Sequence, residues 1–131
     1  LVEEPLRFGA GRVAVEEAVE RCGIARALVA GPRVMVLDEA LAGLDLGAQA
    51  RLLNLLRDLQ REWRLSYVFL THDLAAAAFL GGELLVLEQG RVAEQGPVDP
   101  VLANPASAAL RELLEQRPAV LRRGVEPEDR V

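Results

Sequence analysis

The sequence predicts an α/β fold in which two parallel strands are joined by a helix and polar residues follow the end of each strand. Two short aliphatic and β-branched runs, Val34–Leu37 and Tyr67–Leu70, are typical of strands buried on both faces. Between them, Ala48–Trp63 has the spacing of an amphipathic helix. A strand, a helix and a second strand form a βαβ unit with a right-handed crossover, so the two strands are expected to be parallel.

The elements that precede and join these strands follow from the same patterns. Val13–Ala30 has helical periodicity, with Gly23 expected to interrupt the helix and Gly31-Pro32 to end it. Ala42–Gly47 is expected to be a loop. The face of the following helix that we expect to pack on the core consists of Leu52, Leu53, Leu56, Leu59 and Trp63.

Beyond the second strand, the sequence predicts a short helix and a hairpin. Asp73 is a suitable N-cap for a helix that Gly81-Gly82 would stop. Leu84–Leu87 is expected to be a third strand, and Gln89-Gly90 a turn into a hairpin partner at Arg91–Gln95.

The last part of the chain is predicted to hold two helices and a tail. Asp99-Pro100 and Asn104-Pro105 each join a capping residue to a proline, which suits the first helical position. The second helix is expected to reach about Gln116. The tail RRGVEPEDRV is charged, and we expect residues 118–131 to be disordered.

Composition excludes several classes of protein. With 131 residues and 51% hydrophobic residues, the chain can form one domain with a core. The net charge of -5, with no basic tract, argues against nucleic acid as a partner. A single cysteine, Cys22, excludes an internal disulfide framework, and no signal peptide or membrane-spanning run is visible. These features favour a cytosolic chain.

Polar groups that suit nucleotide hydrolysis follow both predicted parallel strands. Asp38-Glu39 follows the first and Thr71-His72 the second, so both leave from the carboxyl end of the sheet, where open α/β folds bind ligands. A carboxylate such as Asp38 can hold magnesium, which takes only one or two carboxylates besides waters and phosphate oxygens. Glu39 can accept a proton from an attacking water, and His72 can bond a terminal phosphate. Taken alone, Asp38-Glu39 is about as typical of a solvated pair or a helix cap at the end of a strand as it is of a functional site.

Three motifs in order carry a resemblance to a known family. The stretches VMVLDE, LAGLDL and LSYVFLTHDL resemble the Walker B strand, the D-loop and the histidine switch of ATP-binding-cassette (ABC) transporter ATPases. IARAL, before the first strand, is similar to the end of the helix that follows that family's signature sequence. The resemblance implies that Asp38 holds magnesium, Glu39 and His72 are catalytic, and Asp45 is the D-loop residue that communicates across a dimer.

The downstream sequence resembles one subfamily. LNLLRDLQREWRLSYVFLTHDL and LEQGRVAEQGPVDPVLANP are similar to the ATPases that drive uptake of oligopeptides, dipeptides and nickel. The resemblance implies ATP and magnesium as cofactors. It also implies a second ATPase subunit and transporter membrane subunits as partners, and a place in the cytoplasm or peripherally at the inner face of the cell membrane.

The chain departs from this family in what it lacks. All fifteen basic residues are arginine, so a phosphate loop with its lysine is absent, as are the glutamine loop and the LSGGQ-type signature. The expected fold is therefore a partial P-loop sheet with flanking helices, without the phosphate-loop strand and the N-terminal antiparallel subdomain. The predicted domain is 1–117, with a helical-subdomain remnant at 1–23, a Walker B to switch region at 24–96 and C-terminal helices at 97–117.

These observations leave three hypotheses for function. The first is a truncated or degenerate ATP-binding subunit of an ABC importer for peptides or nickel, inactive alone. The second is a non-catalytic interaction module derived from such an ATPase, and the third is a gene remnant. Whether the chain is an enzyme stays open at this point, because the hydrolytic residues are present and the phosphate loop is not.

Overall fold

In the computed structural model of the chain, residues 10–116 are described, with side chains from Glu16 onward. These residues form two compact units that divide between Thr71 and His72. Each unit mixes helices with a two-stranded sheet, so the predicted α/β class is confirmed. The predicted domain boundaries and the missing strand and subdomain stay predictions, and the predicted tail at 118–131 lies outside the described residues.

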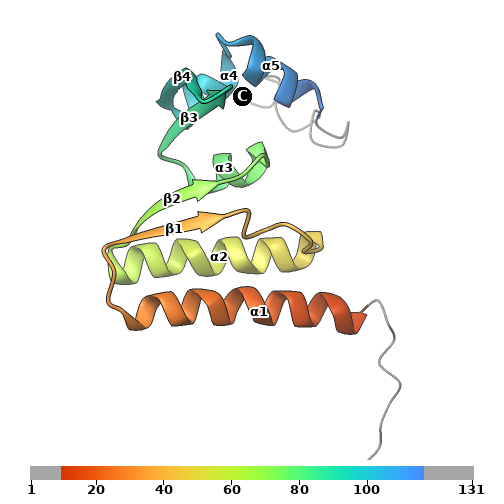
Figure 1. The fold of residues 1–131 in the computed structure, drawn as a ribbon, viewed down its shortest axis with the longest axis vertical. Coiled ribbons are helices and arrows are strands. Elements are labelled where there is room, and N and C mark those ends of the chain that lie inside the picture. The colour runs from red at the N-terminus through yellow and green to blue at the C-terminus, as the bar shows by residue number, and fades with distance from the viewer. Residues whose placement is uncertain (1–9, 117–131) are drawn as a thin grey trace, which may run out of the picture. The chain divides into compact units, whose positions relative to one another are not determined.

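The first unit is the predicted βαβ arrangement preceded by a long helix (Figure 1). Its elements are α1 (Ala10–Val29), β1 (Val34–Asp38), α2 (Leu46–Trp63) and β2 (Ser66–Leu70). The two strands are parallel, with Val36 opposite Val68. This confirms the parallel pairing that the strand, helix and strand pattern predicted.

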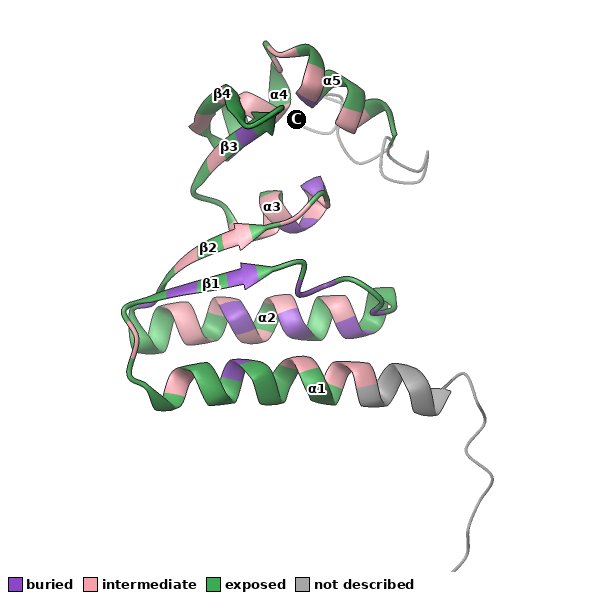
Figure 2. Ribbon diagram, in the orientation of Figure 1, coloured by how far each residue is buried: buried purple, intermediate pink, exposed green. Residues whose placement is uncertain are grey.

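The core of the first unit lies between the sheet and its helices. Met35 and Leu37 of β1 are buried, as are Leu52 and Leu56 of α2, and Figure 2 shows buried positions along both elements. The Tyr67 hydroxyl donates to the Leu56 carbonyl oxygen at 2.7 Å, which fixes β2 to the middle of α2.

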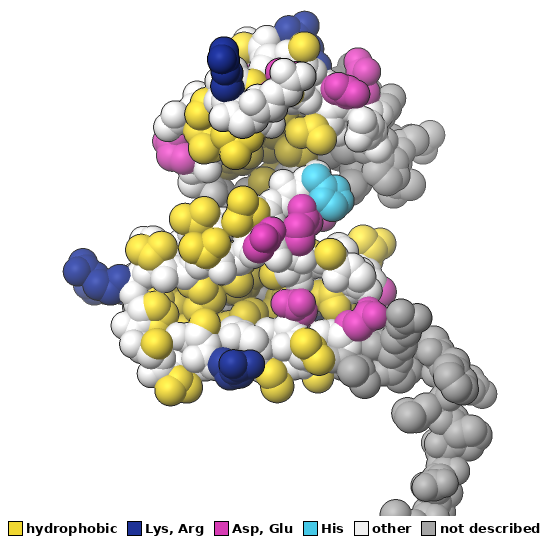
Figure 3. All heavy atoms as spheres, in the orientation of Figure 1, with side chains coloured by type: hydrophobic (Ala, Val, Ile, Leu, Met, Phe, Trp, Pro, Cys, Tyr) yellow, Lys and Arg dark blue, Asp and Glu magenta, His cyan; other side chains and the backbone are white. Residues whose placement is uncertain are grey.

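The prediction that both strands are buried on both faces is wrong. Along β1 exposed and buried residues alternate, and Val36 is 64% exposed. Along β2, Val68 is 50% exposed. In the first unit the helices cover one face of the sheet, and the opposite face presents aliphatic side chains that gather on its surface (Figure 3).

Two predictions for the helices of this unit are also wrong. Gly23 does not interrupt α1, which runs unbroken from Ala10 to Val29. A helical glycine costs only about 1 kcal/mol relative to alanine, and continuing hydrogen bonds offset that cost. Trp63 is 54% exposed rather than part of the core, because it stands in the last turn of α2, beyond the sheet-facing leucines.

The second unit is a hairpin covered by three short helices. Its elements are α3 (Leu74–Leu80), β3 (Glu83–Glu88), β4 (Arg91–Pro97), α4 (Val98–Ala103) and α5 (Ala108–Glu115). The strands are antiparallel, with a bulge between Val86 and Leu87. A core of Leu74, Val86 and Leu110 joins α3 and α5 to β3.

Two predictions made from local sequence patterns in the second unit, a turn and a helix cap, are confirmed. The predicted turn is confirmed, with Gln89 and Gly90 both at positive φ (49° and 74°), the backbone that suits a tight hairpin. The Asp73 cap of α3 is confirmed, because its carboxylate accepts from the amides of Ala75 and Ala76.

The predicted starts of the last two helices are wrong. Helix α4 begins at Val98, so Asp99 lies in its first turn rather than at its cap. Helix α5 begins at Ala108 with Ser107 as its N-cap, three residues after the expected Asn104. Asn104 instead ends α4, and its backbone amide donates to the Pro100 carbonyl oxygen. The end of α5 near Gln116 is confirmed.

In the described part of the chain, every helix is too short or too polar to cross a membrane.

Candidate functional site

Asp38 and Glu39 lie at the carboxyl end of β1, and both are exposed. Asp38 is the last residue of the strand and is paired in register with Leu70 of β2. The Glu39 amide donates to the Leu70 carbonyl oxygen at 2.9 Å, so the sheet ladder extends one residue past the strand. The Ala42 amide in turn donates to the Glu39 carbonyl oxygen at 3.0 Å, which begins the following turn.

Glu39 has a left-handed backbone, with φ at 51°. This region is unfavourable for residues with a side chain, by roughly 1–2 kcal/mol, and glycine or asparagine usually occupies it. The conformation turns the chain at the strand end, directly after Asp38. No local sequence pattern predicts this conformation, because glutamate is not a residue type that favours positive φ.

Asp45 is fixed at the start of α2. Its Oδ1 accepts from the Ala48 amide at 2.7 Å, the standard N-cap bond, and its own carbonyl oxygen accepts from the Gln49 amide. Because α2 begins on the side where β1 ends, Asp45 stands at the same edge of the first unit as Asp38 and Glu39.

The loop between Glu39 and Asp45 is held by a residue that sequence reasoning missed. The Gln49 side chain donates to the carbonyl oxygens of Leu41 and Leu44 at 3.3 and 3.1 Å. Both leucines are buried, which anchors the loop to the core from the other side. The only sequence signal is a glutamine in the first turn of a helix, which is too common to indicate this contact.

His72 is exposed and is the first residue of the second unit. Its place relative to the carboxylates therefore stays a prediction from the parallel strands. Among residues 10–116, no group of three or more histidine, cysteine or carboxylate side chains is arranged to hold a metal ion. Magnesium needs fewer protein ligands than that, so the exposed carboxylate of Asp38 fits the chemistry of such an ion.

A small cleft reaches Asp38 from the side of α1. Its volume is about 170 Å³, and α1 and β1 form most of its walls. Glu20 is the second carboxylate that lines it. The predicted residues Glu39, Asp45 and His72 do not line this cleft.

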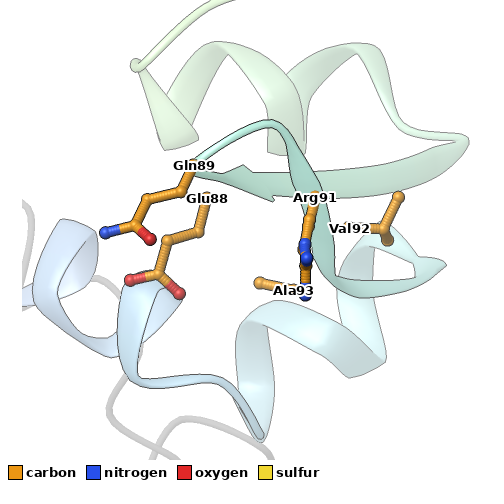
Figure 4. Close-up of a pocket in the computed structure, with 5 residues that line it drawn as sticks. All are labelled: Glu88, Gln89, Arg91, Val92 and Ala93. Atoms are coloured by element: carbon orange, nitrogen blue, oxygen red, sulfur yellow. The ribbon is translucent and has the colours of Figure 1, made fainter.

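A wider hollow of about 550 Å³ lies at the hairpin turn of the second unit (Figure 4). Glu88 and Gln89 extend to one side of the turn, away from Val92. The lining side chains therefore do not converge on a common point, and none of the predicted site residues is among them.

An ion pair links α1 to α2. Arg51 donates to both carboxylate oxygens of Glu17, at 3.0 and 2.7 Å, and Arg21 pairs with Glu17 at 3.0 Å. These bonds, above all the hydrogen bonds from Arg51, lower the pKa of Glu17. Arg51 and Glu17 are 34 residues apart in the sequence, and only the structure shows that α1 lies within reach of Arg51.

Comparison with known proteins gives a consistent group of relatives, although no protein-family model matches the chain. A di/tripeptide transport ATP-binding protein of Pseudomonas aeruginosa is 42% identical over 101 residues, which are 77% of this chain and 31% of that protein. A nickel import ATP-binding protein of Rhodospirillum rubrum is 44% identical over 104 residues, 77% of this chain and 38% of that protein. A dipeptide transport ATP-binding protein of Escherichia coli is 38% identical over 111 residues, 85% of this chain and 32% of that protein.

The chain thus spans about a third of the length of these relatives. Over about three quarters of its own length, it is homologous to part of ABC transporter ATP-binding proteins, among them proteins for peptide transport and nickel import.

Proposed function

We propose that this chain carries the hydrolytic half of an ATP site in an ABC importer for peptides or nickel. In this proposal Asp38 holds magnesium, Glu39 accepts a proton from the attacking water, Asp45 communicates across an ATPase dimer and His72 bonds the terminal phosphate. The names of the relatives, which are ATP-binding proteins for peptide and nickel transport, support the substrate class. A second ATPase subunit and membrane subunits would be the partners.

The left-handed backbone of Glu39 is the observation that supports this proposal best. A non-glycine residue with φ at 51° is unfavourable unless its surroundings hold it there, and such residues concentrate at functional sites. Here the amide of Glu39 is held by Leu70 and its carbonyl oxygen by Ala42. The carboxylate is thereby presented at the strand end, beside Asp38, in solvent that a water nucleophile and a phosphate can reach.

The chemistry divides between the two carboxylates. Bound magnesium would neutralise phosphate oxygens, and one carboxylate from Asp38 is a sufficient protein contribution to such an ion. Glu39 would orient the water and take its proton. No lysine of this chain can reach the outer phosphates, since the chain contains none. We therefore expect that the chain alone binds nucleotide weakly and does not turn it over.

The test is nucleotide binding and turnover with Mg-ATP as the probe. The full chain would be assayed alone and together with the portion of the Rhodospirillum rubrum nickel import ATP-binding protein that it does not match. We expect turnover only in the mixture, and its loss in Glu39→Gln with ATP binding retained. Glu88→Gln, an exposed carboxylate of β3, is the matched control and should leave turnover unchanged.

Two results would contradict the proposal. Micromolar ATP binding by the isolated chain would show that its phosphate site is complete after all. If the Glu39→Gln variant still turned ATP over, Glu39 would not be the residue that accepts the proton from water.

A non-catalytic interaction module is the second candidate. The exposed aliphatic face of the β1 and β2 sheet favours it, because soluble proteins seldom leave such faces without a use. Stable association with transporter subunits, without turnover in any mixture, would support this candidate over the first.

A further inference from the structure

The loop between β1 and α2 joins two of the proposed site residues, because Glu39 begins it and Asp45 ends it as the N-cap of α2. Figure 1 shows this loop running from the end of β1 back to the start of α2 within the first unit. Its conformation therefore decides how both carboxylates are presented. The hydrogen bonds that shape the loop join residues between 39 and 49, so they require no residue outside this stretch.

The backbone of the loop forms two successive turns. The Ala42 amide donates to the Glu39 carbonyl oxygen at 3.0 Å. The Leu44 amide donates to the Leu41 carbonyl oxygen at 3.3 Å, which is longer than the usual N–H···O distance of about 2.9–3.0 Å. The second turn is therefore held weakly by its own backbone.

The side chain of Gln49 adds two bonds to this second turn. Its amide nitrogen donates to the carbonyl oxygens of Leu41 and Leu44 at 3.3 and 3.1 Å. Helical side chains tilt toward the N-terminus of their helix, so a residue in the first turn of α2 can reach back onto the preceding loop. The Gln49 backbone amide also donates to the Asp45 carbonyl oxygen at 2.9 Å, so one residue holds both the loop and the helix start.

The surroundings of these two bonds make them hard to replace with water. Both bonds are partly buried, and Gln49 itself is half-buried. The side chains of Leu41 and Leu44 are packed in the core, which keeps the carbonyl oxygens close to α2. A partly buried carbonyl oxygen that loses its donor is unfavourable, so removal of the Gln49 amide should change the loop.

Glu39 needs support from this loop because its backbone is left-handed, with φ at 51°. A strained residue of this kind persists where the surrounding structure fixes it from several sides. Leu70 fixes the amide of Glu39 and Ala42 fixes its carbonyl oxygen. The position of Ala42 in turn depends on the loop that Gln49 holds, so Gln49 supports Glu39 through the loop backbone.

We propose that Gln49 is a positioning residue for ATP hydrolysis, which holds the loop so that Glu39 and Asp45 keep the orientation that turnover requires. This inference rests on the proposed function, because it takes Glu39 as the base and Asp45 as the residue that communicates across the dimer. A misplacement of about 1 Å can cost a reacting group roughly a hundredfold in rate. Loss of the Gln49 donors should therefore lower kcat much more than it raises the KM for ATP.

The first test measures the loop in the full chain without nucleotide, by amide hydrogen exchange followed by NMR. Gln49→Met removes both donors and keeps the length and helix propensity of the side chain. We expect the protection factors of the Ala42 and Leu44 amides to fall at least tenfold, while that of the Ser66 amide, which donates to Arg33, stays within twofold.

Gln60→Met is the matched control. Gln60 is also half-buried and lies about 16 Å further along α2, so its replacement should leave the loop unchanged. A fall at Leu44 without one at Ala42 would show that the effect of Gln49 does not reach Glu39, and would overturn the proposal. An equal fall in Gln60→Met, or no fall in either variant, would overturn it as well.

Gln49→Glu and Gln49→Lys give a second comparison, which also serves if Gln49→Met does not fold. At neutral pH the glutamate has the shape of glutamine without its donors, whereas the lysine keeps donors. We expect the protection of Ala42 to fall at least tenfold in Gln49→Glu and to stay within threefold of the parent in Gln49→Lys. The helix dipole favours a glutamate in the first turn, so an effect on the helix alone would run in the opposite direction. Equal protection in the two variants would overturn the proposal.

The second test measures turnover of Mg-ATP by the chain together with the unmatched portion of the nickel import ATP-binding protein. We expect Gln49→Met to lower kcat at least tenfold with the KM for ATP changed less than threefold, and Gln60→Met to change neither. Turnover that Glu39→Gln abolishes and Gln49→Met leaves intact would overturn this inference alone. Absence of turnover by the parent chain would overturn the proposed function, and with it the role of Gln49 in hydrolysis, whatever the protection factors are.

Discussion

At the scale of single residues, the turn at Glu39 decides what the end of β1 can do. A left-handed residue at this position redirects the chain immediately after the strand. The hydrogen bonds that Leu70 and Ala42 make with its backbone hold this conformation. Consequently the stability of the turn and the chemistry of the side chain can be changed separately.

We predict that Glu39→Val destabilises the chain by about 1–2 kcal/mol, because β-branched residues are strained at positive φ. Glu39→Gln should change the free energy of unfolding by less than about 0.5 kcal/mol, since the two side chains have similar shape. Urea unfolding followed by circular dichroism measures both. Equal stabilities for the two variants would show that the backbone at residue 39 is not left-handed in solution.

At the scale of elements, side chains at the N-terminal end of α2 stabilise both the start of the helix and the loop that precedes it. Asp45 caps the helix through the Ala48 amide, and Gln49 holds the carbonyl oxygens of Leu41 and Leu44. The cap gives Asp45 a structural role that is compatible with, and separable from, the proposed role in dimer communication.

Asp45→Ala should cost about 1 kcal/mol of stability, the usual value of an N-cap. Asp45→Asn should retain most of that stability, because the amide oxygen can accept the same bond. Asp58→Ala, at an exposed position in the middle of α2, is the control and should stay within about 0.5 kcal/mol of the parent. Thermal unfolding compares the three, and a destabilised Asp58→Ala with an unaffected Asp45→Ala would argue against the cap.

Helix α5 is held at its start by a carboxylate from β4. Glu94 accepts from the amides of Ala106 and Ser107 at 2.9 and 3.0 Å, and from the Ser107 hydroxyl at 2.8 Å. Ser107 in turn caps α5 through the Leu110 amide. Arg111 donates to the carbonyl oxygens of Ala106 and Ser107, which closes the network from the helix side. These contacts explain why α5 starts at Ala108 rather than after Asn104.

This network predicts a dependence of stability on pH. The hydrogen bonds from the backbone amides of Ala106 and Ser107 and from the Ser107 hydroxyl hold the pKa of Glu94 below its ordinary value of 4.5. A lowered folded-state pKa means that the contribution is fully present above about pH 5 and is lost as the pH falls through the folded-state value. The protection factors for amide hydrogen exchange at Ala106, Ser107 and Leu110, which correct for the slower intrinsic exchange in acid, should therefore fall on acidification. In Glu94→Gln this fall should be smaller, and an identical pH dependence of the protection factors in the two chains would contradict the assignment.

At the scale of the whole molecule, the described residues leave much of their aliphatic surface uncovered. Val34, Val36, Val68 and Leu70 share the open face of the first sheet, and Leu85, Leu87 and Val92 are exposed in the second unit. Open strand edges accompany both sheets in the described part of the chain. Such surfaces promote association.

We expect the isolated chain to be marginally stable and to associate as its concentration rises. Sedimentation velocity over a hundredfold range of concentration measures this. Val36→Thr combined with Val68→Thr should reduce association, because threonine keeps the strand propensity and adds a polar hydroxyl. A sharp cooperative melt from a monomer that persists at every concentration would contradict the expectation.

Much of the fold was predictable because its signals are local. The apolar runs of β1 and β2, the Gln89-Gly90 turn and the Asp73 cap each depend on residues within a few positions of one another. The position of Asp38 and Glu39 at the end of β1 was predictable for the same reason, because they directly follow the apolar run that forms the strand. The roles assigned to Asp38, Glu39, Asp45 and His72 are proposals that rest on this placement and on the relatives.

The sequence alone determined the order and type of the elements in the first unit and the position of its carboxylates at the strand end, because periods of two and 3.6 residues specify strands and helices locally. Only the tertiary structure decided which face of each strand is covered, how Glu39 turns, and where α5 begins. Those outcomes depend on contacts between distant residues, such as Glu17 with Arg51 and Glu94 with Ser107. A local pattern carries no information about partners that are brought together only by folding.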